Sequence, residues 1–560
     1  MTPALDTHLL IAGFVDELAR CGVTDACTSP GSRCAPLVLA LAREPHLRAY
    51  SHVDERCSGF FALGLAKASG RPVALTCTSG TAAANLAPAV IEASEAGVPL
   101  IILTADRPPE LREVGAGQTI DQIKLYGDAV RWFFEVGNHE YSPERMRWIR
   151  ALACRAVAEA SGERPGPVHL NWPLREPLVP GGPVEVRGGR PGGRPWVLRE
   201  RAPLGAGDLG VHVGASARGV IVAGRSERPL APAVCALAEQ AGHPLLADPQ
   251  SGARAGAAAI AHYDLLLRDG AFAAAHVPQV VIRIGDLPTC KPLRRWLASL
   301  TDADQIAIGA PGTWQDPDGV VSRWLRADPG SLVTPEPADG GWLAQWREAD
   351  ARVADVVTQT LADELSELSV ARALGEWLPA EATLFVASSM PVREIETVWP
   401  VREEPPRVLS NRGANGIDGT LSSAFGVAAA SEGPVCALIG DVAFAHDIGG
   451  LLAAARLGLA LTIVVFDNGG GGIFDHLPIA AEQDVYEEHI ATPTGLDFAL
   501  AAELYGLDYA APQSLDELRS LLVGTLAKRE RSTLLHLRFQ RAAGVALQRR
   551  LATAAAAALN

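Results

Sequence analysis

The chain has 560 residues, a formal net charge of −15 and 48% hydrophobic residues. This length is more than one hydrophobic core can serve and predicts about three domains, while the composition is that of a globular α/β protein rather than a disordered one. The acidic balance argues against nucleic-acid binding, and an anionic substrate would need a local cluster of cationic side chains.

The nine cysteines form no CxxC pair and show no regular spacing, which favours a reduced compartment over a disulfide framework. The first residues, MTPALDTHLLIAGF, lack the basic-then-apolar plan of a signal peptide. No stretch without charges or glycines is long enough to span a membrane. We therefore expect a soluble, cytoplasmic protein with no membrane and no nucleic-acid partner.

Residues 1–182 alternate helix-like and strand-like segments, a rhythm that predicts an N-terminal domain with a doubly wound parallel sheet. The expected helices are 8–21, 57–68 and 82–96, and the expected strands are 24–28, 47–56, 73–79 and 98–105.

Three places in this first domain carry candidate functional side chains. The turn SPGSR at 29–33 leads into a helix that Ser32 could cap. With Arg33 beside it, this helix N-terminus is either an anion site or an ordinary solvated turn. Glu55 ends the second expected strand, where it serves catalysis or complements a helix dipole. Gln118 lies in a loop from which it could reach a ligand.

Residues 181–195 are a linker by composition and precede a middle domain, 196–335, again with α/β rhythm. Strands are expected at 219–223, 245–247, 280–284 and 305–308. No GxGxxG follows a strand there, so we expect no dinucleotide site. Lys291 follows the third of these strands and either meets an anion or is solvated. A second linker, 328–341, leads to a third domain, 342–560, whose first part, 342–377, has a helical pattern.

The third domain contains a strand–helix–strand pattern. Its two apolar runs, 435–439 and 461–466, end in Gly440-Asp441 and in Asp467-Asn468 followed by four glycines. Parallel strands in such a unit are neighbours, so Asp441 and Asn468 should face one crevice. A carboxylate, an amide oxygen and a backbone carbonyl of the glycine loop suit Mg²⁺, and the glycines let a diphosphate approach the backbone. The alternative is an ordinary strand pair with polar ends.

Gly440-Asp441 followed by Asn468 resembles the metal-diphosphate motif of thiamine diphosphate enzymes. That family commonly has glycine where Val442 stands and two asparagines where Asp467-Asn468 stand, but the ligand oxygens are kept. The resemblance implies three doubly wound α/β domains (pyrimidine-binding, middle and diphosphate-binding). It also implies thiamine diphosphate with Mg²⁺ or Mn²⁺, held by Asp441, Asn468 and the Gly470 carbonyl. Glu55 would then hydrogen-bond the aminopyrimidine ring of the cofactor.

A set of local motifs narrows the resemblance. These motifs are SPGSR (29–33), DER (54–56), TADRPPELREVGAGQTIDQ (104–122), SSMPVR (388–393), NRGANGIDG (411–419) and DNGGGGIF (467–474). Together and in this order they resemble the 2-succinyl-5-enolpyruvyl-6-hydroxy-3-cyclohexene-1-carboxylate (SEPHCHC) synthase family of menaquinone biosynthesis. The resemblance implies a transferase that decarboxylates 2-oxoglutarate and adds the succinyl carbanion equivalent to isochorismate, giving SEPHCHC and CO₂.

The resemblance also assigns side chains. Arg33, Lys291, Arg393 and Arg412 would supply the cations for two acidic substrates, with Ser32 and Gln118 as hydrogen-bond donors; arginine suits this task because its fork binds a carboxylate bidentately. The remaining cofactor residues would be Ser389, Ile417 and Gly440, with Ile417 holding thiamine diphosphate in its bent shape. The site would lie at a subunit interface of a homodimer or tetramer.

Two alternatives are weighed against this interpretation. An acetohydroxyacid-synthase-like enzyme or a 2-oxoacid decarboxylase would keep the cofactor, act on less charged acceptors and depend less on Arg393 and Arg412. A non-catalytic protein that binds anions or nucleotides would not need Glu55. The sequence leaves open whether a pathway product regulates the enzyme through the middle domain.

Overall fold

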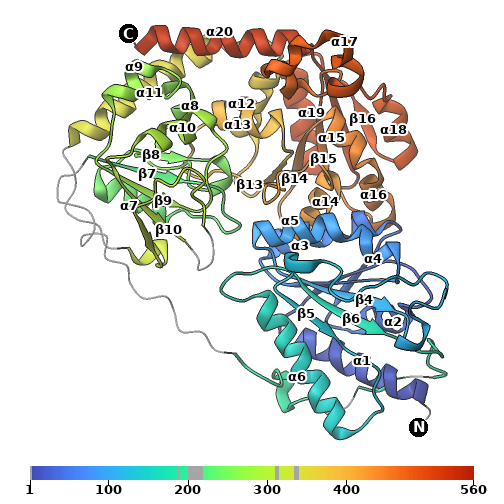
Figure 1. Cartoon of the computed structure of the whole chain (residues 1–560). Helices are drawn as coiled ribbons and strands as arrows, with labels where there is room; N and C mark the ends of the chain where they lie inside the picture. Colours follow the sequence, from blue (N-terminus) through green and yellow to red (C-terminus); the bar gives the residue numbers. More distant parts are fainter. Residues whose placement is uncertain are drawn as a thin grey trace. The chain divides into compact units, whose positions relative to one another are not determined.

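A computed structural model describes residues 3–182, 184–186, 188–199, 218–309, 314–332, 340–362 and 364–559. The chain divides into two compact units: unit 1 is Met1–Arg201, Asn411–Ser431 and His446–Ala460, and unit 2 is Ala202–Ser410, Glu432–Ala445 and Leu461–Asn560. Unit 1 holds one sheet and unit 2 holds two, and within each sheet all paired strands are parallel (Figure 1).

The sheet of unit 1 has the order β2-β1-β3-β4-β6-β5. Its strands are β1 (Asp25–Thr28), β2 (Arg48–Ser51), β3 (Val73–Cys77), β4 (Leu100–Asp106), β5 (Trp132–Glu135) and β6 (Val168–Pro173). The inner strands β3, β4 and β6 are buried along their whole length, as expected for strands that helices cover on both faces.

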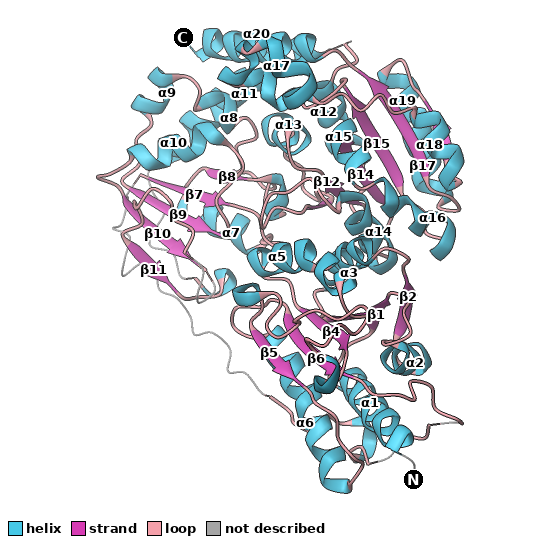
Figure 2. Ribbon diagram, turned by 45° about the vertical axis from the view of Figure 1, so that its right-hand side comes forward, coloured by secondary structure: helices cyan, strands magenta, loops and turns pink. Residues whose placement is uncertain are grey.

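The helices of unit 1 lie on both faces of this sheet, with α1 and α6 on one face and α3 and α5 on the other (Figure 2). The α-helices are α1 (Pro3–Arg20), α2 (Ala35–Arg43), α3 (Glu55–Ser69), α4 (Thr81–Asn85), α5 (Ala87–Ala96), α6 (Pro143–Ala160), α14 (Thr420–Ala430) and α16 (Leu452–Leu457). The short 3-10 helices are η1 (Pro109–Leu111), η2 (Gly127–Ala129), η3 (Pro191–Gly193) and η7 (Ile448–Leu451).

Helices α3 and α14 pack against each other at glycines. A Cβ atom on Gly64 would lie 2.0 Å from the Ser423 carbonyl oxygen, and one on Gly426 would lie 2.1 Å from the Phe61 carbonyl oxygen. The backbones therefore touch directly, and no larger residue fits at either position.

Unit 2 contains a five-stranded sheet of order β11-β10-β9-β7-β8 and a six-stranded sheet of order β13-β12-β14-β15-β17-β16. The first sheet consists of β7 (Gly219–Ala223), β8 (Leu245–Ala247), β9 (Val280–Ile284), β10 (Asp304–Ile308) and β11 (Arg323–Leu325). The second consists of β12 (Thr383–Val386), β13 (Arg407–Leu409), β14 (Val435–Gly440), β15 (Thr462–Asp467), β16 (Asp508–Ala510) and β17 (Thr533–Arg538).

The longer helices of unit 2 cover these two sheets. They are α7 (Ala233–Ala241), α8 (Tyr263–Leu266), α9 (Gly270–Ala275), α10 (Lys291–Ser299), α11 (Gly340–Leu361), α12 (Glu367–Trp377), α13 (Met390–Val398), α15 (Asp441–His446), α17 (Gln483–Tyr486), α18 (Phe498–Tyr505), α19 (Leu515–Lys528) and α20 (Arg541–Leu559). The short turns are η5 (Pro249–Ser251), η6 (Pro329–Ser331), η8 (Gly472–His476), η9 (Pro478–Ala481) and the π-helical η10 (Glu487–Ala491).

One continuous apolar cluster links the two sheets of unit 2. It includes Val220 and Val222 of β7, Trp342 and Trp346 of α11, and Leu535 of β17. The two tryptophans pack against each other, and Trp346 also packs against Phe272 and Trp296. The opposite face of the first sheet has a cluster of its own. The predicted fold class of three helix-covered parallel sheets is confirmed. The predicted domain boundaries stay a prediction, and residue 335, the predicted end of the middle domain, lies outside the described residues.

The middle-domain strands agree closely with their predicted ranges, but four predictions were wrong. The second strand ends at Ser51, and Glu55 is instead the first residue of α3. Asp54 caps that helix by accepting hydrogen bonds from the Arg56 and Cys57 amides at 2.8 and 3.4 Å. The polar run before Glu55 is thus a helix start signal rather than a strand end.

The other three errors also concern helix ends. Ser32 caps no helix, because α2 begins only after Cys34, whose side chain makes no capping hydrogen bond. The single helix predicted for 82–96 is two helices, α4 and α5, which meet at Leu86. The pattern 342–377 is likewise two helices, and Ser366 starts the second with a capping box.

All nine cysteines are free, and eight of them are buried. None of the helices in the described part of the chain combines the length and apolar character needed to cross a bilayer.

Replacing His169 with glutamine should flatten the pH dependence of stability. The ring is buried in β6, it lies 2.7 Å from the Thr104 hydroxyl, and burial lowers its pKa to about 3. Below about pH 6.5 the unfolded chain binds a proton that the folded chain does not, so stability falls by about 1.4 kcal/mol per pH unit as pH drops toward the folded pKa.

Urea unfolding of both proteins at neutral pH and near pH 5 measures this effect. We expect the wild-type protein to lose more unfolding free energy on acidification than H169Q, while H489Q, which alters an exposed ring, follows the wild type. Equal losses in wild type and H169Q would contradict the expectation.

Candidate active site

The carboxyl ends of β14 and β15 meet at one edge of the six-stranded sheet. The two strands pair in parallel register up to Gly440 and Phe466. Asp441 follows the first strand and Asn468 follows the second. A carboxylate oxygen (Oδ2) of Asp441 accepts a hydrogen bond from the Gly470 amide at 2.7 Å. Asp441 and Asn468 therefore lie at one edge of the sheet, as predicted.

Asn468 presents an unused acceptor at this edge. Its Nδ2 donates to Oε1 of Glu367 at 2.8 Å, whereas its Oδ1 is buried and has no hydrogen-bond partner among the described residues. A buried oxygen without a partner is costly, and a bound cation would satisfy it.

Gly470 has a backbone conformation that suits glycine alone. Its φ is +132°, and a Cβ there would lie 2.5 Å from the Ala491 carbonyl oxygen. The neighbouring Asp467 does not compete for the same ligand, because it accepts a hydrogen bond from Nε2 of His536 at 2.8 Å, an interaction that holds its pKa below the usual value. Asn468, rather than Asp467, is thus the second ligand candidate.

The charge at this edge also favours a cation. Burial raises the pKa of Asp441 to about 6 and raises that of Glu367. Glu394 is buried with both carboxyl oxygens unpartnered among the described residues, and burial and the nearby Glu367 raise its pKa well above the usual value. Acids crowded in this way, next to an unpartnered amide oxygen, fit the hard-oxygen ligand set of Mg²⁺ or Mn²⁺.

A second set of functional side chains lies in unit 1, after the carboxyl ends of β3 and β4. Ser79 joins two of them: its hydroxyl accepts from Nη1 of Arg107 and donates to the Gln118 carbonyl oxygen at 2.8 Å. Gln118, which adopts a φ of +56°, also donates its Nε2 to the Ser79 carbonyl at 3.0 Å. Gln118 is exposed, so its amide oxygen remains accessible to a ligand.

Arg33 and Arg107 place two cations in the same neighbourhood. Arg33 is held by the Leu174 carbonyl, to which its Nη1 donates at 2.8 Å. Burial, followed by the charge of Arg33, lowers the pKa of Arg107. Sequence reasoning missed Arg107, although its position directly after the buried strand β4 was a usable signal. Ser32, on the same turn as Arg33, is exposed.

Glu55 is half-buried on the first turn of α3, and burial raises its pKa. Burial and then the charges of Cys34 and Glu55 raise the pKa of the Cys77 thiol at the end of β3. A half-buried acid with a raised pKa is suited to exchange a proton or to make a strong hydrogen bond with a ligand.

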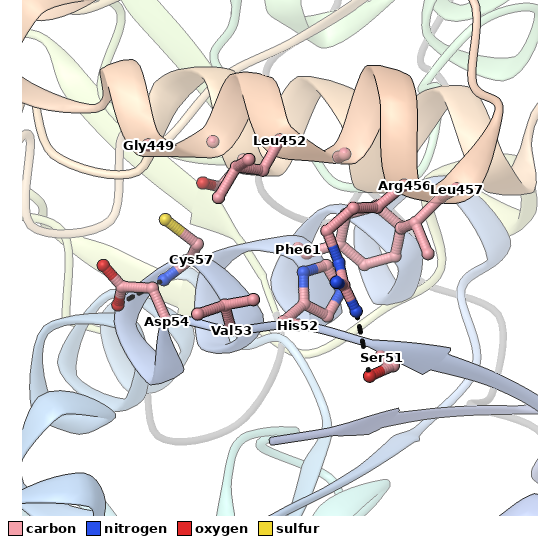
Figure 3. Close-up of a pocket in the computed structure, with 13 residues that line it drawn as sticks. Ser51, His52, Val53, Asp54, Cys57, Phe61, Gly449, Leu452, Arg456 and Leu457 are labelled. Carbon is pink, nitrogen blue, oxygen red and sulfur yellow. Dashed lines mark hydrogen bonds between the residues drawn. The ribbon is translucent and has the colours of Figure 1, made fainter. Parts of the chain in front are cut away.

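A small pocket beside this turn shows how α3 is anchored (Figure 3). Arg456 reaches from α16 toward the Ser51 hydroxyl, 3.5 Å away, beside the His52 ring. His52 packs against Phe61, and burial and then Arg456 lower its pKa to about 4, so the ring is neutral. The pocket wall thus includes the residues that lead into α3 and its first turn.

The loop 411–419, which carries Arg412 and Ile417, belongs to unit 1. Glu92 of α5 holds it, because the two carboxylate oxygens accept from the Gly413 and Ala414 amides at 2.8 and 2.6 Å. Lys67 lies 4.0 Å from the same carboxylate, and both side chains are buried. This clamp fixes the backbone on either side of Arg412 and Ile417.

Unit 2 carries the remaining cations on two helices. Lys291 is the first residue of α10, and Arg393 lies on α13, where it donates to the Ser389 carbonyl. Asp264 ties the two helices together, since it accepts from the Cys290 thiol at 3.1 Å and from the Thr397 hydroxyl at 3.2 Å. Lys291 and Arg393 are thus held on linked elements. Ser389 adopts a φ of +76° at the start of α13.

The predicted site residues therefore fall into two groups. Unit 1 carries Ser32, Arg33, Glu55, Gln118, Arg412 and Ile417, and unit 2 carries Lys291, Ser389, Arg393, Gly440, Asp441, Asn468 and Gly470.

One further cluster of potential metal ligands among the described residues lies elsewhere in unit 1, at Glu17, Cys21 and Cys154. Arg150 occupies it, because its Nη1 donates to Oε2 of Glu17 at 2.7 Å. A guanidinium in this position disfavours a bound cation.

Three family models match the chain in succession. The thiamine pyrophosphate enzyme N-terminal TPP-binding domain matches residues 10–125, the middle domain of thiamine pyrophosphate enzymes matches residues 211–386, and the C-terminal TPP-binding domain matches residues 393–537. The crystal structure of benzoylformate decarboxylase from Polynucleobacter necessarius is similar, with a TM-score of 0.69 over 95% of this chain and 98% of that one. At 19% identity, that likeness concerns the fold alone.

Curated relatives match nearly the whole chain. The 2-succinyl-5-enolpyruvyl-6-hydroxy-3-cyclohexene-1-carboxylate synthase of Geobacillus thermodenitrificans is 45% identical over 93% of this chain and 91% of its own. The enzymes of the same name from Chloroflexus aurantiacus and Haloarcula marismortui are 42% and 40% identical over 89% of this chain, and over 88% and 89% of their own lengths.

Replacing Glu92 with alanine should release the loop 411–419. Two amide donors then lose their charged acceptor beside the buried Lys67, so we expect the free energy of unfolding to fall by about 3 kcal/mol. Amide hydrogen exchange of Gly413 and Ala414 should become faster. Glu95, an exposed residue on the same helix, supplies the control E95A; slow exchange at both amides in E92A would contradict the clamp.

Proposed function

This chain belongs to the SEPHCHC synthase family of thiamine diphosphate enzymes, and we propose that it decarboxylates 2-oxoglutarate and joins the resulting succinyl group to isochorismate, giving SEPHCHC and CO₂. The observation that carries the proposal at the site is the edge after β14 and β15, where Asp441 and the unpartnered oxygen of Asn468 offer hard ligands to a divalent cation. Such a cation bridges protein to diphosphate.

Each group of residues has a part in this chemistry. Asp441, Asn468 and the Gly470 carbonyl would hold Mg²⁺ or Mn²⁺ and through it the diphosphate of the cofactor. When bound, thiamine diphosphate supplies the nucleophilic carbon and the electron sink for loss of CO₂. The half-buried Glu55 would hydrogen-bond the aminopyrimidine ring, where its raised pKa allows it to share a proton with a ring nitrogen.

The cations of the two units would recognise the substrates. Both proposed substrates carry carboxylates, whereas the protein has a net charge of −15. Burial and then the charge of Arg33 lower the pKa of Arg107, and two neighbouring cations favour the binding of an anion. Arg393, Lys291 and Arg412 would bind further carboxylate oxygens, with Ser32 and Gln118 as hydrogen-bond donors.

We further propose that the active form is a homodimer or a larger even assembly in the cytoplasm. The proposal rests on the resemblance of the motifs, which implies a cofactor bound between the first domain of one subunit and the third domain of another. In this chain Glu55 belongs to unit 1 and Asp441 to unit 2. Ser389 and Ile417 would contact the cofactor from these same two parts.

The test is a product assay with purified protein, thiamine diphosphate, Mg²⁺, 2-oxoglutarate and isochorismate, with the adduct detected by mass spectrometry and CO₂ measured in parallel. We expect an adduct that requires isochorismate and does not form with chorismate. The variant E55Q should lose activity by at least about 100-fold, because it cannot exchange the proton. CO₂ release without an adduct would instead indicate a 2-oxoacid decarboxylase. The absence of both CO₂ and adduct would contradict the proposal.

Arg107 provides a sharper prediction because the sequence motif alone did not single it out. We expect R107K to lower kcat/KM by about 30-fold, or about 2 kcal/mol, since lysine keeps the charge but loses the bidentate fork. Steady-state kinetics with each substrate varied in turn would measure the effect. The control R175A removes an exposed arginine paired with Glu110; equal effects of R107K and R175A would exclude a substrate role for Arg107.

A further inference from the structure

Glu367 contacts Asn468, one of the proposed metal ligands of unit 2, although the two residues are far apart in the sequence. It is the first residue of α12, 101 positions before Asn468, and its side chain is buried with a relative exposure of 8%. Its Oε1 accepts the hydrogen bond from Nδ2 of Asn468 at 2.8 Å. The carboxyl group therefore contacts a predicted metal ligand without being one of the predicted ligands itself.

The chemistry of this contact fixes the direction of the Asn468 amide. An asparagine amide has a donor end and an acceptor end of nearly equal size, so its surroundings decide which end points where. An ionised carboxylate only accepts hydrogen bonds, and Glu367 can therefore bind only the NH₂ end. The Oδ1 atom is then the end of the amide that remains to bind a metal ion. This atom is buried and has no hydrogen-bond partner among the described residues.

The surroundings of Glu367 hold the carboxyl group in place. Ser366 anchors the start of α12 through a capping box with Ser369, which sets the backbone of the next residue, Glu367. On the other side, Gly544 of α20 leaves room for the carboxyl group, because a Cβ at that position would lie 2.7 Å from its Oε2. Two helices far apart in the sequence thus shape the space around one side chain.

We propose that Glu367 is a positioning residue of the metal site, which orients the Asn468 carbonyl oxygen toward the cation. This inference rests on the proposed function, since it takes Asn468 as a metal ligand. It predicts that Glu367 sets metal affinity through a hydrogen bond, not through direct coordination. Outer residues that orient metal ligands in this way typically change metal affinity by about 10- to 100-fold when they are removed.

The experiment titrates Mn²⁺ into the protein with saturating thiamine diphosphate and measures free Mn²⁺ by electron paramagnetic resonance. The variant E367L should weaken Mn²⁺ binding by at least about 10-fold. The variant E367Q should weaken Mn²⁺ binding less than E367L does, since the glutamine carbonyl can still accept from Asn468 Nδ2 although its NH₂ group no longer enforces that direction. Circular dichroism melting of each variant confirms that it is folded.

Two further variants separate this role from a general effect. E376L changes an exposed glutamate on the same helix and should bind Mn²⁺ like the wild type. N468A removes the ligand and should weaken binding at least as much as E367L. Wild-type affinity in E367L, equal losses in E367Q and E367L, or wild-type affinity in N468A would each overturn the inference.

Failure of the proposed function has a different signature. A wild-type protein that forms the adduct while E367L keeps full Mn²⁺ affinity leaves the function standing and removes only the role of Glu367. A wild-type protein that binds no Mn²⁺ and forms no adduct overturns both.

Discussion

The parallel pairing of β14 with β15 is the constraint on which the rest of the site depends. It brings the Asp441 carboxylate to the Gly470 amide, 29 positions further along the chain. Burial at this edge raises the pKa of Asp441 and leaves the Asn468 oxygen without a partner among the described residues. The folded chain therefore bears an electrostatic cost that a bound divalent cation would relieve. Gly470, whose φ is +132°, requires glycine for this geometry.

Much of the fold could be predicted because local patterns carry it. The buried strands β7, β8 and β9 begin and end where the apolar runs do. The meeting of Asp441 and Asn468 could be predicted for the same reason: polar residues that end neighbouring parallel strands share an edge of the sheet. The errors arose at helix starts, where a short polar run such as that before Glu55 either ends a strand or caps a helix, and only the cap geometry decides.

The missed residues have a common physical cause. Glu92 and Glu367 act through hydrogen bonds to backbone or side-chain atoms more than 100 positions away, and no local pattern announces such contacts. Arg107 follows a strand end, as the predicted residues do, but its link to Gln118 runs through Ser79 and requires the folded chain. The motifs thus predicted the residues that we propose to contact the cofactor and substrates, whereas Glu92 and Glu367, which hold such residues in place, became visible only in three dimensions.

A site assembled from two subunits can be tested most directly by mixing two inactive proteins. E55Q lacks the carboxylate of unit 1 that we propose as the activator, and D441A lacks the proposed metal ligand of unit 2. If each active site draws these residues from different subunits, dissociation and random reassembly of the mixture restores about a quarter of the wild-type activity, because each mixed dimer contains one intact site. A mixture that reassembles into mixed dimers but remains inactive would contradict the shared site.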